Sequence, residues 1–124
     1  MMPKQVFGTS PVPLSPAVRA GDFVFVSGQV PIGPDGIVVS GGIAAETRQV
    51  LENLRAALAL AGCGMEDVVK TMCWLRDRDD FPAFNSVYAD FFATDPPARS
   101  TAESRLMLDI AVEIEAIAFK PLAP

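Results

Sequence analysis

Charged and hydroxyl side chains alternate with their neighbours along the C-terminal part of the chain. Two sets of alternate positions carry them: Arg99, Thr101, Glu103 and Arg105, then Glu113 and Glu115. Because successive side chains of a strand point to opposite faces, each set shares one face. A planar guanidinium binds a carboxylate through two parallel hydrogen bonds, and a carboxylate beside it can handle a water molecule. We expect the two sets of charges to share a face, which would give an anion-binding arginine near a carboxylate. The pattern alone favours the alternative, a solvated face with cross-strand ion pairs.

The absence of histidine from the sequence narrows the chemistry further. It excludes serine-histidine and cysteine-histidine nucleophiles and the usual zinc sites, so we expect no metal. The formal net charge is −5, from 10 Lys and Arg against 15 Asp and Glu, and no basic stripe is present to bind nucleic acid. The two cysteines, Cys63 and Cys73, lie among apolar residues, which predicts inert thiols and a reducing compartment. Catalysis would rest on arginine, carboxylates, hydroxyls, backbone groups or water.

Two further polar segments are candidates for a binding site. Ser27-Gly28-Gln29 follows an apolar run, and its backbone N–H groups could face an anion because glycine allows close approach; a plain strand end is the alternative. Asn85 lies in a segment rich in Phe, and its spacing predicts an exposed helix residue unless a loop docks on it. The glycine-rich turns at 33–36 and 41–42 lack the spacing of a phosphate-binding loop.

The length and composition set the scale of the fold that must position these residues. A chain of 124 residues, half of them hydrophobic, is enough for one domain over 1–124 with its own core. No apolar run approaches the ~18–20 residues of a membrane span. The N-terminal residues lack the apolar core of a signal peptide, so we expect a cytoplasmic protein with no membrane partner.

Hydrophobic periodicity predicts an interleaved order of strands and helices. Apolar and β-branched runs predict strands at 23–26, with both faces covered, at 67–75, at 99–106 and at 111–119, and a hairpin around 33–39. Apolar residues at steps of three and four predict a helix over 44–61 and a second one that begins near Asp79 or Asp80, with Pro82 in its first turn. This order favours an α+β domain, a mixed β-sheet with two helices packed on one face.

The other face of such a sheet is left without cover. Met72, Trp74 and the Val and Ile residues of the last strand would give it apolar content. Rings of two or three copies would bury such faces together, and the clefts between copies would be candidate sites.

Six segments, taken together, resemble the RidA family, the reactive-intermediate (enamine/imine) deaminases also called the YjgF or L-PSP endoribonuclease family. They follow in the family's order and cover nearly the whole chain: 20–29, 47–54, 67–71, 85–92, 97–100 and 112–118. The resemblance implies a chorismate-mutase-like fold, a homotrimer and sites between subunits. It also implies hydrolysis of 2-enamine or 2-imine acids, such as 2-aminoacrylate and 2-iminopropionate, to 2-keto acids and ammonia without a cofactor.

The resemblance also assigns roles to individual residues. Arg99 matches the arginine that holds the substrate carboxylate, and Glu113 matches the glutamate that positions or activates water. Ser27 and Gly28 match the loop that lines the pocket, and Asn85 matches the helix asparagine near the site.

Two departures from the family pattern point to a divergent subgroup. Leu14 stands where the best-studied deaminases have a tyrosine in the pocket, and Thr101 stands where many members have cysteine or another small residue. We count both among the substrate-binding residues. Two other functions stay open. One is a non-catalytic module of the same fold that binds a carboxylate or 2-keto acid, and the other is the ribonuclease or translation-inhibitor activity of the family's older name, which the net charge disfavours.

Overall fold

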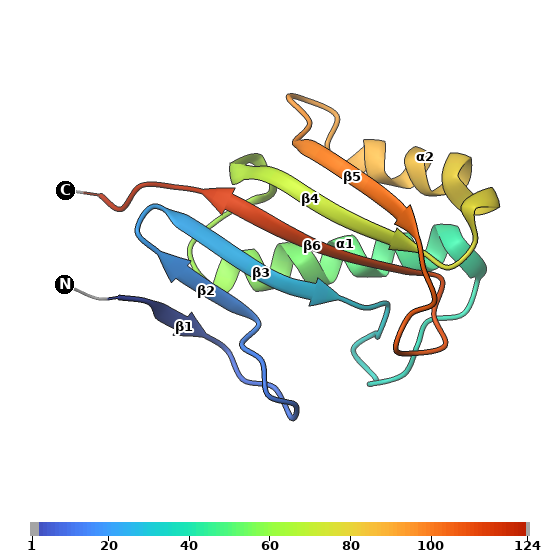
Figure 1. The fold of residues 1–124 in the computed structure, drawn as a ribbon, viewed down its shortest axis with the longest axis horizontal. Helices are drawn as coiled ribbons and strands as arrows, with labels where there is room; N and C mark the ends of the chain where they lie inside the picture. The colour runs from blue at the N-terminus through green and yellow to red at the C-terminus, as the bar shows by residue number, and fades with distance from the viewer. Residues whose placement is uncertain (1–2, 124) are drawn as a thin grey trace.

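The computed structural model describes residues 3–123 and contains one six-stranded sheet with two helices (Figure 1). The elements in chain order are β1 (Gln5–Phe7), β2 (Ala17–Ala20), β3 (Phe23–Gln29), α1 (Gly42–Leu60), β4 (Val68–Leu75), α2 (Phe81–Phe91), β5 (Ala98–Glu103) and β6 (Val112–Phe119). Short 3-10 turns at Met65–Asp67 and Arg78–Asp80 precede β4 and α2.

The strand order in the sheet is β1-β2-β3-β6-β4-β5, in which only the β4–β5 pair is parallel. Parallel strands need a crossover connection, and α2 supplies it between β4 and β5. Helix α1 makes the corresponding crossover from β3 to β4, which both run antiparallel to β6. In Figure 1 both helices lie behind the sheet, on the same face. The predicted α+β class, with two helices on one face of a mixed sheet, is therefore confirmed.

The hydrophobic core lies between the sheet and the two helices. Alternate side chains of the central strands point into it and meet apolar side chains of both helices: Val24, Val26, Cys73, Leu75, Val112 and Ile114 from the strands, and Leu51, Leu54, Leu58, Phe84 and Tyr88 from the helices. Leucines three and four residues apart share one face of α1, which explains why the sequence predicted this helix well.

The opposite face of the sheet has no cover in the single chain. Phe23, Phe25 and Phe119 are 43%, 44% and 42% exposed, and the rings of Phe23 and Phe119 pack edge to face, 5.2 Å apart. The prediction that both faces of 23–26 are covered is therefore wrong for one chain. We call this surface the open face; Met72, Trp74 and Ile117 also belong to it. Of the Val and Ile residues in the last strand, only Ile117 lies there, because Val112 and Ile114 point into the core.

The N-terminal third differs most from the sequence-based prediction. Strands β1 and β2 are three and four residues long, too short for a clear alternation. The predicted hairpin around 33–39 reduces to one isolated bridge between Ile32 and Val38. Prolines at 31 and 34 lack the N–H that a strand ladder needs, so this segment stays a loop.

Helix α2 begins at Phe81, close to the predicted start, with Pro82 in its first turn. Asp80 occupies the N-cap position, but its side chain makes no capping hydrogen bond. Instead, Asp77 accepts from the Asp79 N–H and caps the preceding 3-10 turn. No helix among residues 3–123 is long and apolar enough to cross a membrane.

Candidate functional site

The Arg99 side chain lies on the helix face of the edge strand β5. Arg99 pairs with Thr71 of β4, whose side chain is buried under the helices. The guanidinium carbon lies 4.8 Å from the ring centroid of Tyr88, 5.4 Å from that of Phe84 and 5.5 Å from that of Phe81. Within residues 3–123 the guanidinium has no carboxylate at ion-pair distance. The cation therefore rests on aromatic rings, which attract it without occupying its hydrogen-bond donors.

Helix α2 presents these three rings because their spacing of three and four residues places them on one side of the helix. The Tyr88 hydroxyl lies 2.8 Å from Oγ1 of Thr71, and both groups are buried. Burial raises the pKa of the Tyr88 hydroxyl, so the ring stays neutral.

Two more predicted site residues lie on the same side of the sheet. Thr101 follows Arg99 by two residues and pairs with Cys73, so its side chain also faces the helices. Asn85 is half-buried on the helix face that carries Phe81 and Tyr88, and the expectation that it is exposed is wrong. Oγ1 of Thr101 and Oδ1 of Asn85 are closed to solvent and have no hydrogen-bond partner among residues 3–123. Buried polar atoms usually have partners, so these two mark an incompletely satisfied region near Arg99.

A pocket of 280 Å³ adjoins this region. Side chains and backbone from the ends of β4 and β5 and from the start of α2 line it: Leu75, Arg78, Phe81, Thr101, Ala102 and Glu103. Phe81 both lines the pocket and contacts Arg99, so the pocket is continuous with the arginine's surroundings.

The Glu113 side chain lies on the open face. Glu113 pairs with Trp74 in the antiparallel β4–β6 ladder, and Trp74 points away from the helices. Partial burial, and then the negative charge of Glu115, raise the pKa of the Glu113 carboxyl above its ordinary value. A 170 Å³ pocket lined in part by Trp74 and Arg105 adjoins Glu113.

Gly28 lies directly against the Glu113 carboxylate. The β3–β6 pairing shifts register between Val26 and Gln29, and this bulge brings the Gly28 backbone toward Glu113. A Cβ atom at position 28 would lie 3.0 Å from the carboxylate carbon and closer still to Oε2. Only glycine fits here without moving Glu113.

Ser27 attaches the preceding loop to the sheet. Its hydroxyl donates to the Ser15 carbonyl at 2.6 Å, and its N–H donates to the Pro16 carbonyl at 3.0 Å. The hydroxyl is therefore already engaged within the chain. Leu14 precedes this attachment and is 48% exposed, so its side chain is available at the surface.

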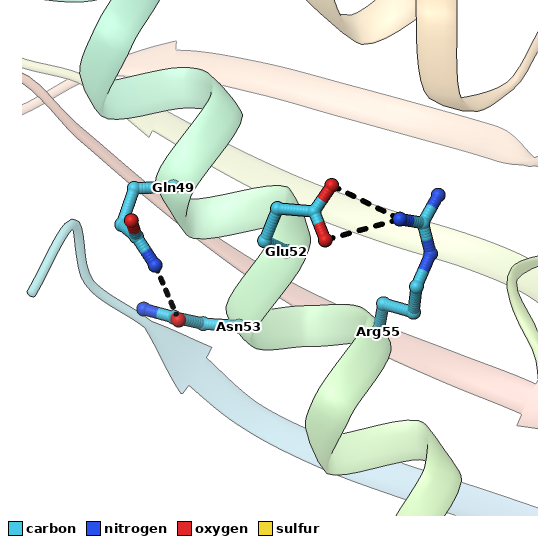
Figure 2. A network of polar contacts seen from close by, with 4 residues as sticks. All are labelled: Gln49, Glu52, Asn53 and Arg55. Atoms are coloured by element: carbon cyan, nitrogen blue, oxygen red, sulfur yellow. Dashed lines mark hydrogen bonds and ion pairs between the residues drawn. The ribbon is translucent and has the colours of Figure 1, made fainter. Parts of the chain in front are cut away.

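Asn53 of α1, which the sequence analysis did not single out, anchors the segment after Gly28. Its Nδ2 donates to the carbonyls of Val30 and Ile32, at 2.9 and 3.0 Å. Gln49 donates to Oδ1 of Asn53 at 2.8 Å and orients the amide, as Figure 2 shows. The sequence signal for this anchor was the spacing of Gln49 and Asn53, two polar residues one helical turn apart at the edge of the apolar stripe.

The predicted site residues thus form two groups on opposite faces of the sheet. Arg99, Thr101 and Asn85 lie on the helix side, and Glu113 and Gly28 lie on the open side. Both cysteines are buried, and burial raises the pKa of Cys73 to about 11. Among residues 3–123 no cluster of three or more His, Cys, Asp or Glu side chains is placed to hold a metal.

Comparison with known proteins agrees with this architecture. The family model described as Endoribonuclease L-PSP matches residues 8–120. A RutC family protein of Pyrococcus horikoshii is 49% identical over 110 residues, which cover 87% of each chain. The structure of YyfA of Yersinia pestis, a Rid family protein, superposes with a TM-score of 0.89 at 39% identity over 94% of this chain and 98% of that chain. Escherichia coli TdcF with bound serine gives 0.88 at 32% identity over 94% and 98%.

The fold and these relatives define a class of small α+β proteins built on a six-stranded sheet with two helices on one face. Within that class, the chain belongs to the Endoribonuclease L-PSP family, which includes the RutC and Rid proteins. The resemblance to the RidA family seen in the sequence is confirmed.

Proposed function

We propose that the protein hydrolyses 2-enamine and 2-imine acids to 2-keto acids and ammonia, without a cofactor, in sites formed between copies of the chain. Arg99 of one copy holds the substrate carboxylate, and Glu113 of a neighbouring copy handles the attacking water. The observation that carries this proposal is the Arg99 guanidinium, which rests on three aromatic rings and pairs with no carboxylate of residues 3–123. Its donors can form the two parallel hydrogen bonds that a substrate carboxylate accepts.

The reaction needs little activation by the protein because the carbon of a protonated imine is already electrophilic. A 2-enamine first takes a proton from solvent on its β-carbon and becomes this protonated imine. Water adds to the imine carbon while the Glu113 carboxylate accepts a proton from the water, which gives a carbinolamine. Glu113 returns that proton to the nitrogen and then accepts the hydroxyl proton as the carbon–nitrogen bond breaks, so that ammonia leaves and the carbonyl forms. A carboxyl whose pKa is raised toward neutrality suits both the uptake and the return of that proton. The protein contributes to the rate by positioning the substrate and the water and by general-base assistance.

Two observations support a small carboxylate as ligand. The relative TdcF was solved with bound serine, which, like a 2-imino acid, carries a carboxylate on the carbon bearing nitrogen. The 280 Å³ pocket beside Thr101 offers apolar lining from Leu75, Phe81 and Ala102 for the substrate's side chain.

The open face supports a homotrimer as the functional unit. Three phenylalanines, Phe23, Phe25 and Phe119, are each more than two-fifths exposed on it. Packing these faces together would remove a contiguous apolar surface from water. Where the open face of one copy also meets the helix side of a neighbour, one site would contain residues from both faces of the sheet.

The test measures 2-imino acids generated in situ by an amino-acid oxidase, with semicarbazide trapping what survives. Wild type should divert imine from the trap, whereas Arg99→Ala and Glu113→Gln should not. Arg55→Ala is the matched control, because Arg55 also lies over an aromatic ring, that of Phe91 at 5.0 Å, but belongs to neither group of site residues. Trapping that wild type leaves unchanged for every side chain tested would contradict the deaminase proposal.

The second candidate is a module that binds a 2-keto acid without turnover. Leu14 favours it, because a leucine there lacks the hydroxyl of the tyrosine found in well-studied deaminases. Calorimetry with 2-oxobutanoate separates the two. A binding module binds this acid but never alters trapping, whereas in the enzyme Glu113→Gln abolishes turnover and retains binding. The net charge of −5 gives no support to RNA as the ligand.

A further inference from the structure

We propose that Tyr88 is a positioning residue, which sets the direction of the Arg99 guanidinium through its ring and is itself held by Thr71. The inference rests on the proposed function, in which Arg99 binds the substrate carboxylate. It adds a residue that contacts no substrate and acts only through Arg99.

Of the three rings around Arg99, that of Tyr88 is the nearest, at 4.8 Å from the guanidinium carbon. Tyr88 is 6% exposed and Thr71 is fully buried, and their hydroxyl oxygens lie 2.8 Å apart. Thr71 is also the residue that pairs with Arg99 across the parallel β4–β5 ladder. Thr71, which holds the Tyr88 ring, and Arg99, which the ring contacts, are therefore neighbours on adjacent strands.

An arginine needs such support because its long side chain loses rotamer entropy when it is fixed. A carboxylate would fix it, but would occupy the donors that the substrate needs. An aromatic face attracts the cation through the ring quadrupole and leaves the N–H groups at the guanidinium edge available. Tyr88 therefore holds Arg99 ready for an anion without competing with that anion.

The hydroxyl of Tyr88 gives the ring a defined orientation. The ring contacts Phe84 at 5.5 Å and Phe92 at 4.7 Å, so it packs along α2 on both sides. Apolar packing alone allows the ring to shift or rotate, whereas the hydrogen bond to Thr71 is directional. We expect that its loss loosens Arg99 even when the ring remains.

The first test compares Tyr88→Leu with Phe91→Leu. Both variants remove an aromatic ring of α2 that lies under arginines, but Phe91 contacts Arg48 and Arg55 rather than Arg99. The NMR signal of the Arg99 side-chain Nε is assigned by its absence from the spectrum of Arg99→Lys. The relaxation of this signal should show greater mobility in Tyr88→Leu only. The dissociation constant for 2-oxobutanoate should rise about tenfold in Tyr88→Leu and stay unchanged in Phe91→Leu.

The second test separates positioning from stability. Tyr88→Phe leaves the buried Thr71 hydroxyl with only the weak contact from the Cys73 thiol, 3.8 Å away, which lowers the free energy of unfolding. Adding Thr71→Val removes both polar groups and should restore most of that stability, because an apolar pair replaces a broken hydrogen bond. Affinity for 2-oxobutanoate and order at Arg99 Nε should stay low in the double variant. Recovery of affinity together with stability would mean that the pair is only structural and would overturn the proposal.

The outcomes also distinguish this inference from the proposed function. Loss of binding in Arg99→Ala, with unchanged binding and Nε order in Tyr88→Leu, refutes the positioning role alone. Wild type that neither binds 2-oxobutanoate nor diverts imine refutes the proposed function, and the Nε measurement still decides whether Tyr88 orders Arg99. Where Tyr88→Leu does not fold, the Tyr88→Phe pair of variants carries the test.

Discussion

Arg99 and Glu113 lie on opposite faces of one continuous sheet. The ladders establish this, because Arg99 is in register with the core residue Thr71 and Glu113 is in register with Trp74 of the open face. Strand β4 separates the two strands that carry them. A small substrate therefore reaches both side chains only where the open face of one copy meets the helix side of another.

The first prediction is that two inactive variants complement each other. Arg99→Ala and Glu113→Gln should each lack deaminase activity, but chains unfolded together in equal amounts and refolded should regain about a quarter of wild-type activity. This is the chance that two neighbours drawn at random supply the two intact residues. The trapping assay measures the recovery.

A chain carrying both substitutions is the control for that mixture. Mixed with wild type, it lowers activity but creates no new site, and mixed with either single variant it should restore nothing. Sites contained within one chain would give no recovery in the first mixture either, which would contradict the shared site.

The second prediction concerns Gly28→Ala. The added methyl group displaces the Glu113 carboxylate, so we expect kcat to fall on the order of 100-fold while binding of 2-oxobutanoate is retained. A kcat that Gly28→Ala leaves unchanged would contradict this link between Gly28 and the Glu113 carboxylate.

The third prediction is a pH dependence set by Glu113. Because burial and Glu115 raise its pKa, the acidic limb of kcat should lie above the ordinary value of 4.5 for a glutamate, with activity lost as the pH falls through it. Glu115→Gln removes the Coulomb contribution and should move the limb to lower pH. A limb that does not move would assign the titration to another group.

The raised pKa of Glu113 should also make the stability depend on pH, but stability should be higher at low pH, whereas activity is higher at high pH. A carboxyl whose pKa is higher in the folded than in the unfolded state favours folding while protonated, and this contribution is lost as the pH rises through the folded pKa. Relative to Glu113→Gln, wild type should therefore lose stability as the pH rises through that pKa. Urea unfolding at several pH values measures the difference.

The fourth prediction concerns specificity at the loop that precedes β2. Leu14→Tyr restores the hydroxyl typical of well-studied deaminases, and we expect kcat/KM to rise for the imine of alanine relative to that of leucine. Stability should change by less than about 0.5 kcal/mol because Leu14 is half exposed. Val12→Tyr, which places the same ring on an equally exposed position of this loop, should leave the ratio unchanged.

The fifth prediction concerns the anchor on α1. Asn53→Ala removes the hydrogen bonds to the Val30 and Ile32 carbonyls and should lower the free energy of unfolding by about 1–3 kcal/mol. Glu52→Ala, one residue away, breaks only an exposed ion pair with Arg55, and should change it by less than about 1 kcal/mol. Urea titration of both variants gives the comparison.

Elements with a long, regular pattern could be predicted from the sequence. The helix expected at 44–61 is observed as Gly42–Leu60, because its leucines repeat at the helical period. The bounds of strands β4, β5 and β6 differ from the expected ones by one residue or less, except that β5 ends three residues earlier. The hairpin expected around 33–39 is present only as a turn with one antiparallel bridge between Ile32 and Val38, because turn residues indicate a reversal of the chain, but not whether strands extend from it.

The relative placement of the site residues needed the structure. Alternation tells which residues of one strand share a face, but not which faces of two strands coincide, since that depends on register. The expectation that the charges of Arg99 and Glu113 share a face was therefore wrong, although both residue types were identified. The partial burial of Asn85 was also missed, although its spacing from Phe81 and Tyr88 places it on the same side of α2 as these rings.

The attachment of the Leu14 loop bears on how relatives of this protein diverge. Ser27 binds the loop at Ser15 and Pro16, and residues 11–14 before these attachment points are exposed at the surface. None of these four residues belongs to the strands that carry Arg99 and Glu113. Under the proposed function, single substitutions in this loop would therefore change which substrate side chains are accepted while Arg99 and Glu113 keep their places.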